Sequence, residues 1–332
     1  MAVTIADIQK LRKMTGAGLA DCKKALTEAE GNIDKAVELV RERGLAIAAK
    51  RSDRETSNGC VLVKSTGNFA AMIALKCETD FVANGAEFIK LTESILDAAL
   101  AAKAKTVEEV QELSLADGTN IAEAVKLRSG ITGEKMELDG YNVLEGENIE
   151  VYDHMNKHTL ATMVQLSKAN AEAGHKVAMQ VAAMKPVALD ETSVPESVKE
   201  EELKVAIQKT KDEQVEKAVA NALKKAGINP AHVDSDDHIE SNMKKGWLTQ
   251  EEADKAREIK KTVGEEKAAN LPAQMIDSIA KGRLAKFFKE NCLVDQEFQF
   301  GDGDKQTVAE YLKSQDADLK IVAYKRFSLS AD

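Results

Sequence analysis

The chain has 332 residues, of which 43% are apolar and 31% charged, with 46 basic and 56 acidic side chains and a net charge of −10. This length predicts about two domains, and the composition is typical of an ordered, helix-rich protein. The acidic balance and the 4% aromatic content argue against a nucleic-acid-binding protein, which needs a basic face and stacking rings. No apolar run reaches the ~18 residues of a membrane span, and the four cysteines are widely spaced, so we expect a cytoplasmic protein without disulfides.

The first 53 residues predict a small three-helix domain. Apolar residues at Ile5, Ile8 and Leu11 share one helical face, and the glycines of residues 15–18 end that helix. A second helix follows from Leu19, and a third ends at Gly44. A bundle of this size is too small to enclose a catalytic site, so we expect it to recognise another molecule.

After a polar linker at 50–58, strands and helices alternate in an α+β pattern. Two strand-like runs flank the turn at 66–68 and predict a hairpin, and Thr79 is a candidate N-cap for the helix that follows. Further helices are expected at 107–115, 120–126, 174–184, 273–290 and 307–314, and further strands at 141–151, 160–166, 292–300 and 319–329.

Residues 187–270 differ from the rest, because 19 acidic and 14 basic side chains crowd this segment. Two charged helices joined by residues 227–246 would form an antiparallel hairpin that projects as an arm. Such an arm is either a solvated projection or a contact surface for a subunit or partner, and a homodimer through the arm is one form of the second reading.

Motifs for catalysis are missing from the sequence. It contains no GxSxG, no phosphate-binding GxxxxGK[ST] loop and no HExxH, and His154 and His158 share i, i+4 spacing only in a segment that reads as a turn. The cysteines fit small buried hydrophobic residues. We therefore expect no enzyme, no metal site and no cofactor.

The most informative segment is Thr79–Asn84, TDFVAN, where a strand gives way to a helix. An acidic residue followed by a large aromatic at an exposed helix start, Asp80 and Phe81, can act together as a charge and a wedge. The alternative is that Thr79 or Asp80 only caps the helix and Phe81 packs into its own core.

This motif and four others occur in one order along nearly the whole chain, which resembles the elongation factor Ts family of guanine-nucleotide exchange factors. The matching segments are residues 11–18 with 21–26, 79–84, 181–186, 282–288 and 324–327.

The resemblance implies an N-terminal module like a ubiquitin-associated domain, a core of two related α+β subdomains and an inserted helical hairpin or coiled coil. It also implies that the partner is elongation factor Tu in its GDP or nucleotide-free form, and that the exchange factor binds no nucleic acid directly. The corresponding parts are 1–53, 54–139, 140–186 with 271–332, and the arm at 187–270.

The resemblance further implies which residues contact elongation factor Tu. In the motif Thr79–Val82, Asp80 and Phe81 would intrude near the Mg²⁺ of the bound nucleotide, and Arg12 and Leu19 of the N-terminal module would grip the nucleotide-binding domain. His154 aligns with a family histidine, but the glycine- and arginine-rich turn that usually follows is replaced by residues 155–159, and the usual preceding basic pair is missing at 138–139. His154 is therefore only a possible contact.

Two other functions compete with nucleotide exchange. One is a non-catalytic helical scaffold that joins other proteins, and the other is a thiol or metal enzyme built on Cys77 and the histidines.

Overall fold

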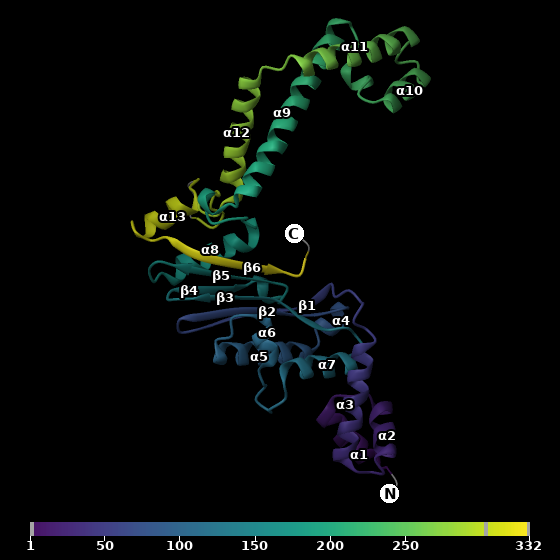
Figure 1. Ribbon diagram of the computed structural model, residues 1–332, viewed down its shortest axis with the longest axis vertical. Helices are drawn as coiled ribbons and strands as arrows, with labels where there is room; N and C mark the ends of the chain where they lie inside the picture. The colour runs from purple at the N-terminus through teal and green to yellow at the C-terminus, as the bar shows by residue number, and fades with distance from the viewer. Residues whose placement is uncertain (1–2, 302–304, 331–332) are drawn as a thin grey trace. The chain divides into compact units, whose positions relative to one another are not determined.

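The computed structural model describes residues 3–301 and 305–330 of the chain (Figure 1). The chain forms two compact units, of which the first holds the residues up to Leu189 and those from Glu297 onward, and the second holds Asp190–Gln296. The class is α+β, as predicted. None of the helices in the described ranges is both long and apolar enough to cross a bilayer.

Three helices open the first unit: α1 (Ile5–Thr15), α2 (Leu19–Glu28) and α3 (Ile33–Ala49). The predicted end of the third helix at Gly44 is wrong, because α3 continues to Ala49. Gly44 faces α7 (Ile121–Thr132) at close range, and this packing outweighs the cost of about 1 kcal/mol that glycine brings to a helix. The buried core of the three helices is made of Leu11, Ala17, Cys22, Ala25, Leu26, Ala29, Ala36 and Val40.

The predicted hairpin forms the first two strands of an antiparallel sheet with the order β1-β2-β3. Its turn places Gly67 at a φ of 56°, which glycine adopts readily. The middle strand is apolar along nearly its whole length because both of its faces are buried. The elements of this half are β1 (Asn58–Thr66), β2 (Phe69–Cys77), α4 (Asp80–Ala83), α5 (Ala86–Ala102), α6 (Val107–Glu112), α7 (Ile121–Thr132) and β3 (Glu137–Glu145).

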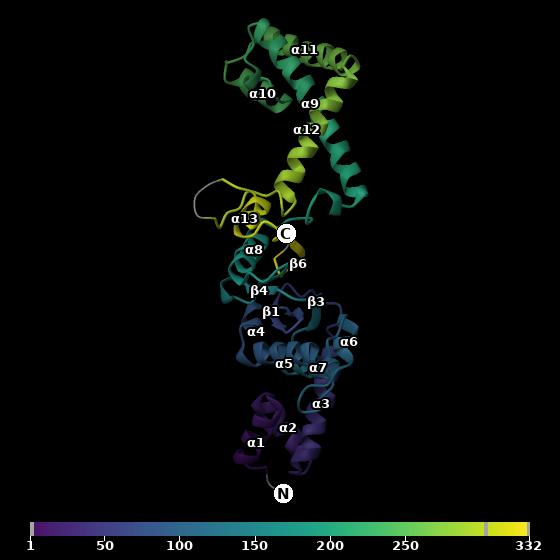
Figure 2. The same ribbon diagram turned by 90° about the vertical axis from the view of Figure 1, so that its left-hand side faces the viewer.

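A second antiparallel sheet, with the order β4-β5-β6, packs face to face on the first. Figures 1 and 2 show the resulting layers, with α5 on the outer face of the first sheet and α8 on the outer face of the second. Its elements are β4 (Ile149–Asp153), the short 3-10 helix η1 (His154–Asn156), β5 (Leu160–Leu166), α8 (Ala171–Met184), α13 (Val308–Gln315) and β6 (Ile321–Ser328).

Three expectations for this unit are wrong in detail. The single strand at 141–151 is two strands in different sheets, because the chain turns at Gly146, whose φ is 134°. The segment 292–300 forms no regular strand, and Cys292, Leu293 and Phe298 are buried without one. Glu297 makes one isolated bridge to Thr307. The helix expected from Thr79 is divided into α4 and α5, because Gly85 is extended and starts the second helix.

The second unit consists of long helices: α9 (Glu196–Lys225), α10 (Asp236–Lys244), α11 (Gln250–Ala269) and α12 (Ala273–Asn291), with the 3-10 turns η2 (Glu191–Ser193) and η3 (Pro230–His232). The longest, α9, packs against both α11 and α12, and an ion pair joins Glu213 to Arg283.

This differs from the predicted arm in two ways. The connection between the paired helices contains a helix of its own, α10, and α12 packs along α9 although the prediction assigned it to the second α+β part. A separate buried cluster stabilises the α10 end of the unit and is made of Leu223, Ile228, Val233, Ile239, Leu248, Ala253 and Ala256.

Candidate functional site

Phe81 is the most exposed large apolar side chain of the described residues, at 87%. It lies on the single turn α4 next to Asp80, which is also exposed, while Ala83 is buried in the core beneath the first sheet. The alternative that Phe81 packs into its own core is therefore wrong. The inner side of the turn anchors it, and the outer side presents an aromatic ring beside a carboxylate.

The backbone of this turn is held by local hydrogen bonds. Thr79 is the N-cap in extended conformation, and its hydroxyl accepts a hydrogen bond from the amide of Val82 at 3.4 Å. The side-chain amide of Asn84 donates to the carbonyl of Asp80 at 2.8 Å, and the thiol of Cys77 donates to the carbonyl of Thr79 at 3.2 Å. Two of the six motif side chains hydrogen-bond to the backbone of the turn and two pack against the core, whereas Asp80 and Phe81 point outward.

A carboxylate from a distant part of the sequence completes the support. Glu134, in the loop between α7 and β3, accepts hydrogen bonds from the amides of Glu78 and Thr79 at 3.1 and 3.0 Å and from the hydroxyl of Thr79 at 2.6 Å. Sequence reasoning missed this residue, because 55 residues separate it from Thr79. Local sequence patterns do not predict a contact between residues so far apart in the chain.

Glu78 makes the reciprocal contact with the loop of Glu134. Its carboxylate accepts a hydrogen bond from the amide of Lys135 at 2.7 Å and pairs with Arg54 at 2.9 Å. The backbone hydrogen bond from Lys135, followed by the hydrogen bond and charge of Arg54, lowers the pKa of Glu78 below its ordinary 4.5. Two glutamates therefore tie the end of β2 to the start of β3.

The turn at residues 154–158 lies beside the motif. A cavity of about 240 Å³ is lined by Asp80 and Asn84 on one side and by Lys157 and His158 on the other. The carbonyl of His158 accepts a hydrogen bond from the amide of Val61 at 2.7 Å, which fixes the turn to β1. The turn that contains His154 thus lies next to the motif of residues 79–84.

His154 itself is half-buried in this turn. Its Nδ1 lies 3.1 Å from the hydroxyl of Tyr152, so its ring has a partner within the protein. The next residue, Met155, is 64% exposed and has a left-handed backbone with a φ of 56°. The sequence pointed to the histidine, whereas the exposed apolar side chain at the turn is that of Met155.

In the N-terminal helices, Arg12 and Leu19 are both exposed, as predicted for a contact surface. Arg12 lies in the last turn of α1, and its carbonyl accepts a hydrogen bond from the amide of Gly16 at 2.7 Å. Leu19 begins α2 and is 53% exposed. Ile5 and Met14 of α1 are exposed as well, and sequence reasoning did not single them out.

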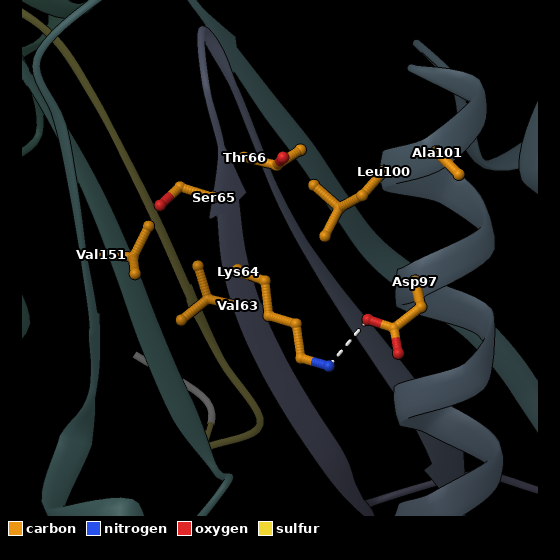
Figure 3. A pocket seen from close by; sticks show the side chains of 8 residues that line it. All are labelled: Val63, Lys64, Ser65, Thr66, Asp97, Leu100, Ala101 and Val151. Carbon is orange, nitrogen blue, oxygen red and sulfur yellow. Dashed lines mark hydrogen bonds and ion pairs between the residues drawn. The ribbon is translucent and has the colours of Figure 1, made fainter.

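A second cavity, of about 580 Å³, lies elsewhere, along the edge of β1 (Figure 3). Lys64 points toward α5 and donates to Asp97 at 2.7 Å, whereas Ser65 points to the opposite side, toward Val151. The hydroxyl and the ion pair therefore face away from each other.

The histidines and cysteines are likewise not gathered into a site. Within the described ranges no three side chains of the His, Cys, Asp and Glu types converge as metal ligands. All four thiols are buried, and burial raises the pKa of Cys60 and of Cys77 to about 12. Thiols of this kind stay protonated and unreactive near neutral pH.

The sequence is similar to those of known proteins. The sequence model of the family described as elongation factor TS matches residues 78–229 and 205–331, which together are most of the chain. The chain belongs to the elongation factor Ts family. The elongation factor Ts of Phocaeicola vulgatus and that of Parabacteroides distasonis are each 62% identical to it over 332 residues, covering both chains completely. The elongation factor Ts of Porphyromonas gingivalis is 39% identical over 333 residues, again across both chains.

Membership in this family decides between the three functions considered. The chain is a nucleotide exchange factor for elongation factor Tu, and not a catalytic enzyme. Asp80 and Phe81 are exposed next to each other on α4, where a partner protein can reach both side chains.

Proposed function

We propose that this exchange factor releases GDP by inserting Asp80 and Phe81 of the Thr79–Val82 motif beside the Mg²⁺ of the nucleotide site of elongation factor Tu. The observation that carries this proposal is the 87% exposure of Phe81 on a turn whose backbone is held in place. A rigid, solvent-exposed aromatic ring gains by being buried, and its support limits the entropy lost when it binds.

The energetics favour a wedge that fits only the nucleotide-free partner. Burying Phe81 contributes about 1.5–3 kcal/mol if a pocket opens for it. By linkage, a partner that prefers the nucleotide-free state weakens nucleotide binding by the same factor that nucleotide weakens the partner. Phe81 therefore drives GDP release as it binds.

Asp80 acts on the metal ion of the partner. Mg²⁺ needs oxygen ligands in near-octahedral order, including waters, and a carboxylate brought close disturbs that arrangement. The exchange factor changes only the rates, so the cellular concentrations of GTP and GDP decide which nucleotide rebinds. This exchange takes place in the cytoplasm, where elongation factor Tu acts in translation.

We propose that the remaining parts of the chain hold the partner in place. Residues 1–53 form the ubiquitin-associated-like module, which grips the nucleotide-binding domain through Arg12 and Leu19. Two three-stranded antiparallel sheets, each with a covering helix, support the reading of two related α+β subdomains. The turn after β4 contributes a further contact, through His154 or through its exposed neighbour Met155.

The arm is proposed to be a helical hairpin that also carries homodimer contacts. Its long helices are charged on the outside and have only short apolar stripes. Sedimentation velocity of the full chain and of a chain lacking residues 190–296 tests this. A monomeric full chain at all concentrations would refute the dimer.

The wedge is tested by stopped-flow release of fluorescent GDP from elongation factor Tu. Phe81→Ala should lower the maximal release rate, whereas Val187→Ala, which trims another exposed apolar side chain of the same unit, should not. An unchanged maximal rate for Phe81→Ala would show that the ring is not the wedge.

A further inference from the structure

We infer that Glu134 is a positioning residue for nucleotide exchange: its carboxylate fixes the direction in which α4 presents Phe81. This inference rests on the proposed role of the Asp80–Phe81 pair. It concerns a residue that lies outside the motif and contacts neither of the two outward side chains.

The helix α4 is very short. It has four residues, Asp80–Ala83, and a single helical turn is unstable by itself because nucleation fixes several residues for one hydrogen bond. Its outward residues make no packing contacts that would stabilise it. Val82 and Ala83 pack its inner side against the core, and the remaining constraint on its direction comes from the contacts at its ends.

Glu134 supplies the contact at the N-terminal end. Its Oε2 accepts hydrogen bonds from two successive amides, those of Glu78 and Thr79, and its Oε1 accepts one from the Thr79 hydroxyl. Three donors converging on one carboxylate fix the position and the rotation of the peptide that begins the turn. Hydrogen bonds to an ionised group are shorter and stronger than neutral ones, which suits this task.

The hydroxyl of Thr79 joins this contact to the helix. It donates to Glu134 and accepts from the amide of Val82, so the carboxylate and the first turn share one oxygen. A displacement of Glu134 is passed directly to the turn. Phe81 lies between the capping residue and Val82 in sequence, and it moves with them.

The backbone of the loop that carries Glu134 is fixed by hydrogen bonds as well. The neighbouring amide of Lys135 donates to Glu78, and the hydroxyl of Ser129 in α7 donates to the carbonyl of Glu134 at 2.5 Å. The loop after α7 is thereby fastened to the helix before it and to the strand β2 opposite. Because its own backbone is fixed, Glu134 can restrict the motion of the segment that begins α4.

The variant Glu134→Gln tests this role. Glutamine keeps the shape of the side chain but removes its charge. Its NH₂ group cannot accept, so the hydrogen bond that the Thr79 hydroxyl donates is lost even where the amide oxygen still accepts from the two backbone amides. We expect the maximal rate of GDP release from elongation factor Tu to fall about tenfold while the concentration for half-maximal rate stays within about twofold. Glu112→Gln, which removes one charge from an exposed side chain of α6, is the matched control and should behave as wild type.

Two further measurements separate positioning from general damage. Amide hydrogen exchange should become faster at residues 78–84 and stay unchanged in α1, α2 and the second sheet. In the Phe81→Ala background, Glu134→Gln should lower the maximal rate no further, because the ring that Glu134 positions is already absent. Thr79→Val removes the shared hydroxyl and should lower the maximal rate in the same way. Thr79→Ser retains the hydroxyl and should restore the rate that Thr79→Val loses.

The outcomes are distinguishable. An unchanged rate for Phe81→Ala overturns the proposed wedge and this inference with it. A reduced rate for Phe81→Ala together with wild-type kinetics for Glu134→Gln overturns the inference alone. A loss from Glu134→Gln that is fully additive with Phe81→Ala, or that appears only as weaker half-maximal binding, also overturns it.

Discussion

Gly44 of α3 and Gly130 of α7 contact each other backbone to backbone. A Cβ atom on Gly130 would overlap the backbone of Gly44, whereas a Cβ atom on Gly44 would lie at an ordinary distance, 3.7 Å from the Cα of Gly130. An ion pair between Arg41 and Glu123 joins the same two helices. The N-terminal helices are therefore attached to the helix whose following loop carries Glu134.

This asymmetry gives a matched pair of variants. Gly130→Ala should lower the free energy of unfolding by about 1–3 kcal/mol, because the helices must separate to admit the methyl group. Gly44→Ala should be neutral or stabilising by up to about 1 kcal/mol, because alanine favours a helix and has room there. Thermal and urea unfolding of both variants decides this, and equal destabilisation would contradict the described contact.

Phe81 should matter for binding and not for folding. With its ring in solvent, Phe81→Ala should change the free energy of unfolding by less than about 0.5 kcal/mol. The same variant should weaken affinity for nucleotide-free elongation factor Tu by about 1.5–3 kcal/mol, which is roughly 10- to 150-fold.

The control for this prediction is Leu75→Ala in the middle of β2, which is fully buried. It should cost about 2–5 kcal/mol of stability. Urea unfolding and titration calorimetry measure the two quantities separately. A large loss of stability from Phe81→Ala would mean that the ring is packed in solution.

The pairing of Glu78 predicts a dependence on acid. Its pKa is lowered by the amide of Lys135 and then by Arg54, so the folded state binds this proton less readily than the unfolded state. The stabilisation is present above the ordinary value of 4.5 and is lost as the pH falls through the lowered pKa. Wild type should exceed Glu78→Gln in stability by a constant amount above about pH 5, and the difference should shrink below pH 4.5. A difference that does not depend on pH would contradict the contact.

The elements that sequence could predict are those set by local rules. The three N-terminal helices follow from apolar spacing and from the glycines of residues 15–18, and the hairpin follows from its glycine turn. The break at Gly146 could not be predicted, since the residues on both sides favour strands and only the second sheet shows where the chain must leave the first.

The site was predictable only in part for a related reason. The motif named Asp80 and Phe81, but whether a phenylalanine packs inward or points outward depends on what surrounds the turn in three dimensions. The role of Glu134 could not be predicted for the same reason, because its partners Glu78 and Thr79 lie in a distant segment, between β2 and α4. The apolar residues at 292–300 suggested a strand, yet burial in a turn satisfies them equally well.

The buried cysteines give a final prediction. Desolvation raises the pKa of Cys60 and Cys77 to about 12 and that of Cys292 to about 11, and it raises the pKa of Cys22 as well. At pH 8 a thiol reagent should therefore modify none of the four in the folded protein within the time that labels free cysteine, and all four in guanidinium chloride. Because the folded pKa values exceed the ordinary 9.0, stability should hold below that pH and fall as the pH rises toward 12. Rapid labelling of Cys77 in the folded chain, or loss of exchange activity on labelling, would instead point to a thiol that takes part in function.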